Sequence, residues 1–569
     1  MLTFREDLEG IRNLARGSLY KGLVEWARIQ PEAVFVVEAE TGRELTYARA
    51  LAAVNAVRRM LGEAPRRVML TLPGGIASAV IWLSALSGGH LLVPVPPDAT
   101  DDEKLRIMQK YEPDVLFVEN TEDFAYPYAR IISRQQCDAL IEEAFFYGAI
   151  EPVEGRICLT TSGSTGTPKG VILKERQIAW TADRVRASHE LSRVDRGLTV
   201  LPFFHVNAPV VSLCSSLLAG GTVIIARRFS RRNFWSWIER YQVTWASIVP
   251  TIVAMLLETE RPAFLPGSLR FVRTGSAALP AADLLAFEAR FGIPVIETYG
   301  LSEAASQVVA NPVPPGVRKP GSAGRPVGVA LRICYPRTDG SGEHVELLRD
   351  VEPGETGEIC IAGPSVIDAY ADNAGQGAFS DGWFRTGDLG YLDEDGYLFI
   401  RGRLREVINR GGENIAPREV EEVLLRHAAV REAAVVGRPD AIYGEQVVAY
   451  LAVRGAWTEA LARELHEFAA QRLSSQKVPI DFIVLDALPR NATGKIDRHL
   501  LRLRERAGTG RREAGDYKGT PGGADESAVC TVNRPLRADQ PAMGASNGGR
   551  GRSTDEGHGE PAHTNTVGG

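Results

Sequence analysis

The sequence has few cysteines, and their positions exclude two common uses of this residue. Six cysteines stand at positions 137, 158, 214, 334, 360 and 530 of 569 residues, without a CxxC pair or a histidine at zinc-site spacing. Neither a structural zinc site nor a disulfide framework fits this pattern. Scattered thiols are typical of a reducing compartment, so we expect a cytoplasmic protein.

Segments for secretion, membrane insertion or nucleic-acid binding are not evident either. The opening residues MLTFREDLEG have acids where a signal peptide would have a basic and then an apolar run. The most apolar stretch, AVIWLSALSGGHLLVPVPP, is broken by two glycines, a histidine and prolines, so we expect no membrane span. The net charge is −6 and basic residues form no block before the tail, which argues against a nucleic-acid partner.

The remaining composition is that of a soluble globular protein with more than one core. Hydrophobic residues make up 44% and charged residues 24% of the chain. A chain of 569 residues exceeds one ordinary domain, so two or more are expected.

From about residue 30 to 400, strand-like runs alternate with helical patterns. The runs VMLTL (68–72) and DVLFVE (114–119) are short and apolar, as buried strands are. Thr46 is a good N-cap for a helix on which Leu51, Val54 and Leu61 share one face. Alternating strands and helices predict an α/β fold with mixed or parallel sheets covered by helices.

A second unit begins near RGRLR (401–405). PREVEEVLLRHAAV predicts a helix that starts at Pro417, EALARELHEFAAQRL predicts another, and REAAVVG, EQVVAYLAV and IDFIVLDALP predict strands. We therefore expect an N-terminal domain at 1–404 and a small α+β domain at 405–506. Residues 507–569 are rich in glycine, polar and charged residues and poor in large apolar ones, which predicts a disordered tail.

The strongest local signal is TTSGSTGTPKGV, residues 160–171. Small residues let backbone N–H groups turn towards one anion, and hydroxyls and a lysine add donors, so the segment predicts a phosphate loop. A flexible Ser/Gly linker is the alternative. A Walker loop is excluded, because Pro168 stands where a glycine is needed and Gly170 where Ser or Thr must hold Mg²⁺.

TSGSTGTPKG resembles the signature of the adenylate-forming (ANL) superfamily of acyl-CoA synthetases, luciferases and peptide-synthetase adenylation domains. Four further segments resemble its other signatures, in its order: YGLSEA (299–304), GWFRTGDLGYLDEDGYLFIRGR (382–403), INRGGENIAPREVEEVL (408–424) and LPRNATGKIDR (488–498). The resemblance spans residues from about 20 to 503. It implies a large adenylate-forming domain, a small mobile C-terminal domain and a reaction in two halves. A carboxylate displaces pyrophosphate from ATP to give an acyl-adenylate, and a thiol then displaces AMP.

The resemblance also implies a role for each residue that matches a signature. Lys495 would be the catalytic lysine, bridging the attacking carboxylate and the α-phosphate, and Glu303 would hold Mg²⁺. Asp388 would bind the ribose hydroxyls, with Arg403 nearby; taken alone, Glu303 could cap a helix and Asp388 could form a turn. The residues implied for nucleotide and thiol binding are Thr161, Ser162, Gly163, Ser164, Thr165, Gly166, Thr167, Lys169, Gly275, Ser276, Ala277, Thr298, Tyr299, Gly300, Ser302, Asp388, Arg403, Gly411 and Gly412.

The family's small domain swings about a hinge two residues after the arginine of its GR motif. That position is Arg405 here, where the family usually has Lys or Asp. A swing would take Lys495 away and bring the thiol tunnel, lined by RGGEN (410–414), towards the acyl-adenylate.

The acid is less well defined by the sequence. His205 in LPFFHVNA is either structural or, as the resemblance implies, an aromatic residue that orients the acyl carboxylate. The expected pocket residues are Val206, Asn207, Ser247 to Thr251, Ser276 to Ala278 and Leu301 to Ala305, among which no Arg or Lys marks a dicarboxylate. Segments 234–252 and 305–328 resemble oxalate–CoA ligases, which favours a small acid.

The thiol expected from the RGGENIAPREVE motif is coenzyme A, and the cofactors are therefore ATP, Mg²⁺ and CoA. Two alternatives remain open. The protein could load a separate carrier protein in a natural-product pathway, or it could be an inactive nucleotide-binding scaffold, which would be expected to lack Lys495, Glu303 or Asp388.

Overall fold

The structure of the protein is a computed structural model, which describes residues 18–121, 126, 128–145, 148–161, 169–262, 267–338, 345–371, 377–490 and 495–507. Several predictions fall outside these residues: the phosphate-loop residues 162–168, residues 491–494 next to Lys495, and the tail from 508 onwards. Within the described part, no helix has the length and apolar character needed to cross a membrane.

A nine-stranded sheet forms one half of the large N-terminal part. Its six central strands are parallel, and β2, β14 and β15 pair antiparallel at the two edges. In sheet order the strands are β15 (Arg325–Pro326), β14 (Ser306–Ala310), β13 (Val295–Leu301), β12 (Phe271–Thr274), β11 (Trp245–Ile248), β9 (Arg196–Thr199), β10 (Thr222–Ile225), β1 (Val34–Glu38) and β2 (Glu44–Thr46).

A six-stranded sheet forms the other half. It is parallel except for the hairpin of its last two strands. In sheet order the strands are β6 (Arg130–Ser133), β5 (Val115–Val118), β3 (Arg67–Leu70), β4 (Leu91–Pro94), β7 (Arg156–Thr161) and β8 (Lys169–Lys174).

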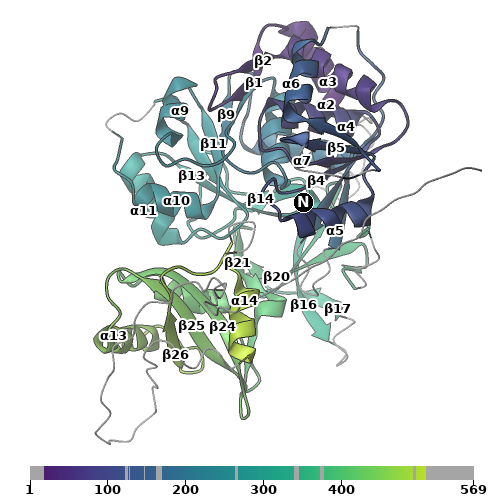
Figure 1. The fold of residues 1–569 in the computed structure, drawn as a ribbon. Coiled ribbons are helices and arrows are strands. Elements are labelled where there is room, and N and C mark those ends of the chain that lie inside the picture. Colours follow the sequence, from purple (N-terminus) through teal and green to yellow (C-terminus); the bar gives the residue numbers. More distant parts are fainter. Residues whose placement is uncertain are drawn as a thin grey trace, which may run out of the picture.

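Helices cover these sheets and share one large apolar core with them (Figure 1). All twelve residues of α4 (Ile76–Ser87) are buried, which explains why this helix is apolar on every side. As predicted, the side chain of Thr46 caps α3 (Tyr47–Leu61). The other helices here are α2 (Ser18–Ile29), α5 (Asp101–Tyr111), α6 (Arg134–Glu142), α7 (Glu175–Ser188), the π-helix η2 (Asn207–Cys214), α8 (Ser215–Ala219), α9 (Phe234–Arg240), α10 (Pro250–Leu257) and α11 (Ala281–Phe291).

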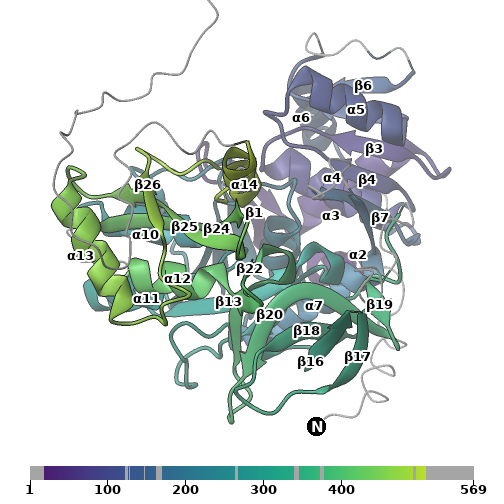
Figure 2. The same cartoon turned by 90° about the horizontal axis from the view of Figure 1, so that it is seen from below.

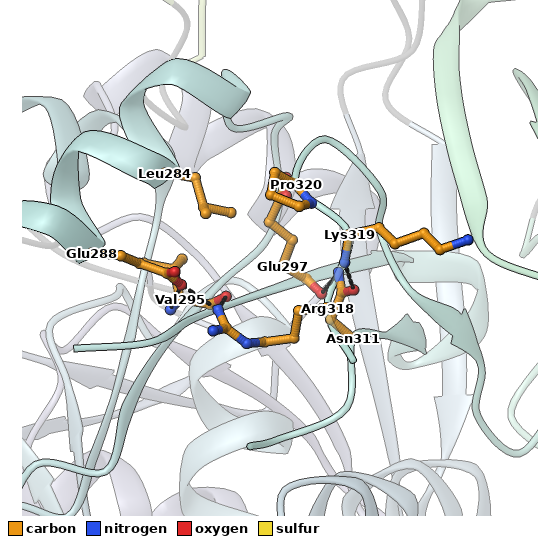
Figure 3. A pocket seen from close by; sticks show the side chains of 8 residues that line it. All are labelled: Leu284, Glu288, Val295, Glu297, Asn311, Arg318, Lys319 and Pro320. Carbon is orange, nitrogen blue, oxygen red and sulfur yellow. Dashed lines mark hydrogen bonds and ion pairs between the residues drawn. The ribbon is translucent and has the colours of Figure 1, made fainter. Parts of the chain in front are cut away.

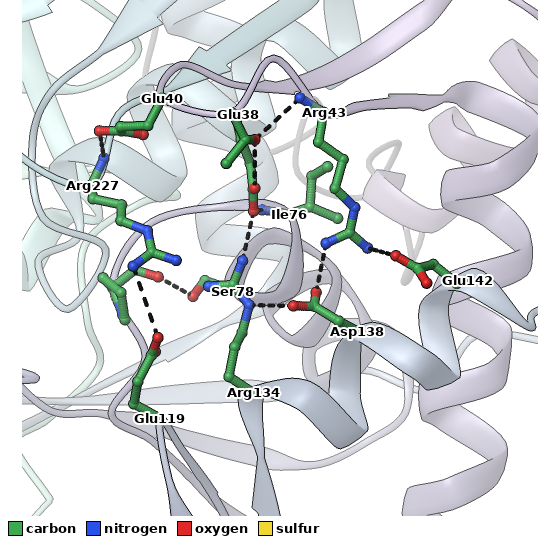
Figure 4. A network of polar contacts seen from close by, with 12 residues as sticks. Glu38, Glu40, Arg43, Ile76, Ser78, Glu119, Arg134, Asp138, Glu142 and Arg227 are labelled. Atoms are coloured by element: carbon green, nitrogen blue, oxygen red, sulfur yellow. Dashed lines mark hydrogen bonds and ion pairs between the residues drawn. The ribbon is translucent and has the colours of Figure 1, made fainter.

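A buried ion-pair network ties the two halves together (Figure 4). Glu38, at the end of β1, accepts from the backbone N–H of Ile76 (3.1 Å) and from Arg134 (2.8 Å). Arg134 also donates to Asp138 (2.7 Å), which in turn pairs with Arg43 (2.9 Å). The network joins β1 to the first residues of α4 and α6.

The predicted alternation of strands and helices does not continue beyond about residue 305. Instead, strands follow strands in an antiparallel sheet, seen beside the larger sheets in Figure 2. Its strands are β16 (Ala330–Thr338), β17 (Val345–Asp350), β18 (Gly357–Ala362), β19 (Phe379–Ser380), β20 (Trp383–Leu392) and β21 (Leu398–Arg403). Each described strand of this sheet pairs with a neighbour close in sequence, which needs no crossover helix.

The C-terminal residues form a separate sheet with its own cores. Alternate residues of β24 face opposite sides: Val435 packs towards α12 and α13, and Val436 towards α14. The elements are β22 (Ile408–Arg410), β23 (Glu413–Ile415), α12 (Pro417–Leu424), β24 (Val430–Asp440), β25 (Gly444–Val453), α13 (Glu459–Ala470), β26 (Asp481–Val484) and α14 (Arg498–Arg506). The two helices and three strands predicted for this unit are therefore present.

Candidate active site

Asp388 is the centre of a buried hydrogen-bonded group. It lies on β20 directly opposite Arg403 on β21, and only 6% of it is exposed. One carboxylate oxygen accepts from the hydroxyl of Tyr299 (2.6 Å) and the other lies 3.0 Å from Nε of Arg403. Burial and the charge of Asp388 raise the pKa of Tyr299, so the phenol stays a donor, and Asp388 raises the pKa of Arg403. Three residues predicted separately from the sequence thus form one group.

Lys495 reaches this group from the C-terminal unit. It directly precedes Ile496, which forms a β-bridge with Arg490, and it keeps solvent-exposed surface. The pKa of Lys495 is lowered, mainly because the surrounding protein shields the ammonium from water and also because the positive charge of Arg403 is near. The negative charge of Asp388 acts in the opposite direction. Lys495 is therefore close enough to both residues for their charges to act on it.

His205 also lies within electrostatic reach of Lys495. The charge of Lys495 acts on its ring, and burial, the larger cause, lowers the pKa of His205 to about 4. At neutral pH the imidazole is uncharged. Its Nε2 is buried and has no hydrogen-bond partner among the described residues. A neutral ring with a spare nitrogen beside a lysine fits the predicted contact with a carboxylate.

Residues 298–303 cover the end of β13 and the turn after it, and β13 pairs with β12, which leads into the predicted nucleotide residues Gly275 to Ala277. Thr298 donates to the carbonyl oxygen of Thr274 (2.8 Å), the residue before Gly275. At Gly300 a Cβ would stand 1.6 Å from the carbonyl oxygen of Ser306, so no other residue fits there. Ser302 and Glu303 follow in the 3-10 helix η3 (Ser302–Ala304), and Ser276 has a left-handed backbone with φ 69°.

Glu303 is half-buried and held at one of its two oxygens. Oε1 accepts from the hydroxyl of Tyr370 (2.8 Å), and the backbone carbonyl accepts from Ile367 N (2.8 Å). Burial raises the pKa of Tyr370, which keeps it a donor. The charge of Glu303 also raises the pKa of Arg403, which links it electrostatically to the Asp388 group.

A metal ion at Glu303 would not be coordinated by protein ligands alone. No cluster of three or more His, Cys, Asp or Glu that could hold a metal ion exists among the described residues. A single carboxylate is a donor set typical of Mg²⁺, which keeps several waters and binds through one or two carboxylates together with substrate phosphates. The residues present therefore fit the predicted ion.

The predicted phosphate loop connects the two strands of the β7–β8 hairpin. Thr161 pairs with Lys169, and Thr160 with Gly170, so the backbone brings both ends of the loop together. The carbonyl oxygen of Gly170 accepts from Ala371 N (2.9 Å), next to Tyr370. Residues Ser162 to Thr167 lie outside the described part, but the hairpin positions the ends of their segment near the residue that contacts Glu303.

Gly411 and Gly412 are not brought to this site. They form the exposed turn of the β22–β23 hairpin, where Gly411 N donates to Tyr443 O (2.7 Å) and Gly412 N to the side chain of Asn409 (3.2 Å). Their hydrogen bonds thus stay within the C-terminal unit. Gly275 is buried, whereas Ser276 and Ala277 are exposed beside Asn207, whose side chain donates to Ser276 Oγ (3.0 Å).

A small cavity lies apart from the Lys495 group, between α11, β13 and residues 311–320 (Figure 3). Its volume of about 50 Å³ is far below that of a nucleotide site. Glu297 lines it, and burial raises the pKa of this carboxyl to about 7 despite a hydrogen bond from Gly321 N (3.1 Å). The cavity has room for water rather than for substrate.

The sequence analysis missed two residues that the structure brings to the site. Tyr370 has no signature of its own and is found only through its contact with Glu303. Arg273 carried a signal, because it interrupts the otherwise apolar strand FVRT just before Gly275. Its side chain is buried against Asn207 and Ser247, both expected pocket residues.

Two known protein families match this chain. Residues 23–371 match the family described as AMP-binding enzyme, and residues 419–495 match the AMP-binding enzyme C-terminal domain. The chain is 44% identical over 354 residues to a sulfoacetate–CoA ligase of Cupriavidus necator, a match that covers 61% of this chain and 67% of the relative. It is 40% identical over 362 residues to an oxalate–CoA ligase of Arabidopsis thaliana, covering 62% and 67% of the two chains.

Among solved structures, the fold is similar to that of o-succinylbenzoate CoA synthetase (MenE) from Bacillus subtilis. The complex with the acyl-adenylate OSB-AMP is 30% identical, with a TM-score of 0.72, and the match covers 84% of this chain and 97% of that one. The same protein has been solved with ATP and a magnesium ion.

Proposed function

This chain belongs to the AMP-binding enzyme family as an AMP-forming acid–CoA ligase, and we propose that it activates a small carboxylic acid with Lys495 as the catalytic lysine. Its substrates are ATP, which binds with Mg²⁺, the acid and coenzyme A. The sulfoacetate and oxalate of the relatives' names support a small acid here.

The observation that carries the role of Lys495 is its position. A residue of the C-terminal unit lies within electrostatic reach of Asp388 and Arg403 in the N-terminal part and of His205. In the first half-reaction a carboxylate oxygen forms a bond to the α-phosphorus of ATP, and the bond to pyrophosphate breaks. Negative charge increases on the α-phosphate oxygens, and the Lys495 ammonium neutralises it there.

The surrounding residues then have separate tasks. Asp388 accepts from the ribose hydroxyls, a role for which its oxygens are already fixed by Tyr299 and Arg403. Neutral His205 donates to the acyl carboxylate without competing with the cation of Lys495. Thr298, Gly300, Gly275 and Ala277 border the adenine.

The phosphates are held by the remaining residues. Ser302 binds the α-phosphate, and the loop from Thr161 to Lys169 encloses the β- and γ-phosphates. Mg²⁺ would supply charge neutralisation at the phosphates when it is bound. Glu303 would hold it through the oxygen that does not accept from Tyr370.

The second half-reaction requires the C-terminal unit to take another orientation relative to the N-terminal part. Gly411 and Gly412 line the path of the CoA thiol in this proposal, yet they lie on an exposed turn away from Asp388. We place the domain boundary between residues 404 and 405 and the hinge at Arg405. Rotation there removes Lys495 and brings the glycine turn towards the acyl-adenylate.

The test is a screen of carboxylic acids for pyrophosphate release, each with and without CoA. We expect acid-dependent release and, with CoA, an acyl-CoA product. Acid-dependent release that yields no acyl-CoA would instead indicate a carrier protein as the acceptor. Release that depends on no acid would contradict the activity altogether.

A further inference from the structure

Arg273 is a buried cation at the acyl end of the site. It lies on β12 on the same face of the sheet as Phe271, which packs into the core against Trp245. Only 2% of Arg273 is exposed. Its guanidinium donates to Asn207 Oδ1 (2.8 Å) and lies at the limit of hydrogen-bond distance from Ser247 Oγ (3.5 Å) and Gln307 Oε1 (3.4 Å).

All three of these partners are uncharged. No carboxylate forms an ion pair with Arg273 among the residues that the structure describes, and its Nε is buried without a partner. Burial lowers the pKa of Arg273 to about 9, so the side chain is still charged at neutral pH. A buried charge without a counter-ion costs several kcal/mol in order-of-magnitude terms, and such a residue usually has a functional reason.

The other two buried arginines of the described part are compensated in the fold itself. Arg134 pairs with Glu38 and Asp138 (Figure 4). Arg58 donates to the backbone carbonyls of Ile150 and Glu151 and lies over the ring of Tyr20. The charge on Arg273 therefore differs from theirs, because among the described residues only neutral side chains contact it, and neither a carboxylate nor a backbone carbonyl compensates it.

The Arg273 charge is connected to the surface that would bind the acid. Asn207 accepts from Arg273 through its oxygen and donates through its nitrogen to Ser276 Oγ (3.0 Å), which is exposed. Gly275 leaves the space that the guanidinium needs, since a Cβ there would stand 3.0 Å from Nη2 of Arg273. The hydrogen bonds thus lead from the buried cation to the exposed hydroxyl of Ser276.

The distance to the reacting carboxylate favours a short acid. Asn207 is two residues from His205, which contacts that carboxylate in the proposed function. Two residues span at most about 7 Å of backbone. A second acidic group that meets the Asn207–Ser276 surface would therefore belong to a small molecule.

We propose that Arg273, with Asn207 and Ser276, selects acids that carry a second anionic group, a carboxylate or a sulfonate, beside the carboxylate that is activated. The proposal rests on the ligase activity above and specifies its substrate class. The incoming anion supplies the counter-charge that Arg273 lacks. An acid with a methyl group in that place leaves the cation uncompensated and is rejected.

The test compares shape-matched acids in pyrophosphate release. Malonate and sulfoacetate each replace the methyl group of propionate by an acidic group, and oxalate does the same for acetate. We expect the wild-type enzyme to prefer the best of the three dianions over its methyl counterpart by at least about 100-fold in kcat/KM. The ranking of malonate against sulfoacetate then distinguishes a carboxylate from a sulfonate.

Two variants localise the effect. Arg273→Met removes the charge at similar volume, and Asn207→Asp gives Arg273 an internal carboxylate. Each should lower kcat/KM for the dianion about 100-fold, mainly through KM, and change that for the monoanion less than about tenfold. The control Arg231→Met removes an exposed arginine that pairs with Glu258 and should leave the preference unchanged.

The outcomes separate this proposal from the one on which it rests. A wild-type enzyme that favours propionate or acetate would overturn the role of Arg273 and leave the ligase activity standing, whether or not the variants fold. Equal loss for both acids in folded Arg273→Met would also overturn it. Pyrophosphate release with no acid at all would overturn both proposals.

Discussion

Asp388 and Lys495 come together at one site, but the chain holds them in opposite ways. Asp388 lies within β20, with β18 on one side and β21 on the other, and both of its oxygens are hydrogen-bonded in a buried setting. Lys495 lies between β26 and α14, outside any helix or strand, and is exposed. Asp388 is thus fixed in its place by a sheet, whereas no helix or strand holds Lys495.

The surroundings of the two residues differ in the same way. Among the described residues, the N-terminal part has one large apolar core and three smaller ones, and the C-terminal unit has two small cores of its own. Between them, Arg401 and Glu422 approach only to 3.9 Å, and Arg403 meets Lys495 as a like charge. Polar contacts of this kind resemble those of transient interfaces. In the proposed mechanism, the part of the site around Asp388 binds the nucleotide in both half-reactions, while Lys495 supplies charge for one of them.

The largest effect should come from Lys495→Ala. Loss of the ammonium should slow acid-dependent pyrophosphate release about 1000-fold, because the charge on the α-phosphate is no longer neutralised. Thioester formation from preformed acyl-adenylate should change less than about threefold. Lys477→Ala, which removes a lysine paired with Glu419 in the same unit, is the matched control. Equal loss of both half-reactions would mean that Lys495 does not act in one step alone.

Asp388→Asn should cause the second-largest loss of activity, and unlike Lys495→Ala it should affect both half-reactions. The amide keeps the shape but loses the charge that Arg403 and Tyr299 share, so KM for ATP should rise and kcat/KM should fall about 100-fold. Both half-reactions bind an adenosine group, so both should slow. The control Asp395→Asn changes an exposed carboxylate that pairs with Lys319. A defect limited to pyrophosphate release would contradict the fixed role of Asp388.

The rates of the two half-reactions should also differ in their pH dependence, which is a smaller effect than that of either substitution. The pKa of Lys495 is lowered from that of an ordinary lysine by its surroundings and by Arg403. The active form is protonated, so the first half-reaction should fall as pH rises through this lowered pKa, by about tenfold per pH unit above it. Thioester formation should not show this loss. Stopped-time assays of each half-reaction across alkaline pH would reveal it, and Lys495→Ala should abolish the difference.

The parts of the site that the sequence predicted are those defined by short motifs. Asp388, Arg403, Tyr299 and Lys495 each stand in a segment that resembles a signature of the adenylate-forming superfamily, and the structure brings them together. The alternating strands and helices of the N-terminal part and the α+β unit also followed from periodicity. These features depend on neighbours along the chain, which a sequence shows directly.

The antiparallel sheet and the contacts of Tyr370 and Arg273 were not predictable in this way. The described residues between 330 and 403 form strands without intervening helices, and the pairing of these strands depends on turns rather than on periodicity. Tyr370 meets Glu303 across 67 positions, and Arg273 meets Asn207 across 66. An arginine in a strand has a charged partner or an exposed head in most settings. Only the structure shows that Arg273 has neither.

The smallest effect should come from Tyr370→Phe, which tests how firmly the fixed part holds its metal ligand. The hydroxyl donates to one oxygen of Glu303 at 2.8 Å and thereby orients the other. Without it the carboxylate should rotate, and the Mg²⁺ concentration for half-maximal pyrophosphate release should rise about tenfold, at the low end of the range for lost outer-shell contacts. At saturating Mg²⁺ the rate should return to that of the wild type, because Glu303 itself is unchanged. Tyr391→Phe, on β20 with its ring stacked on Phe399, is the control. A lowered rate that Mg²⁺ does not restore would show that Tyr370 supports the fold of the site rather than the orientation of Glu303.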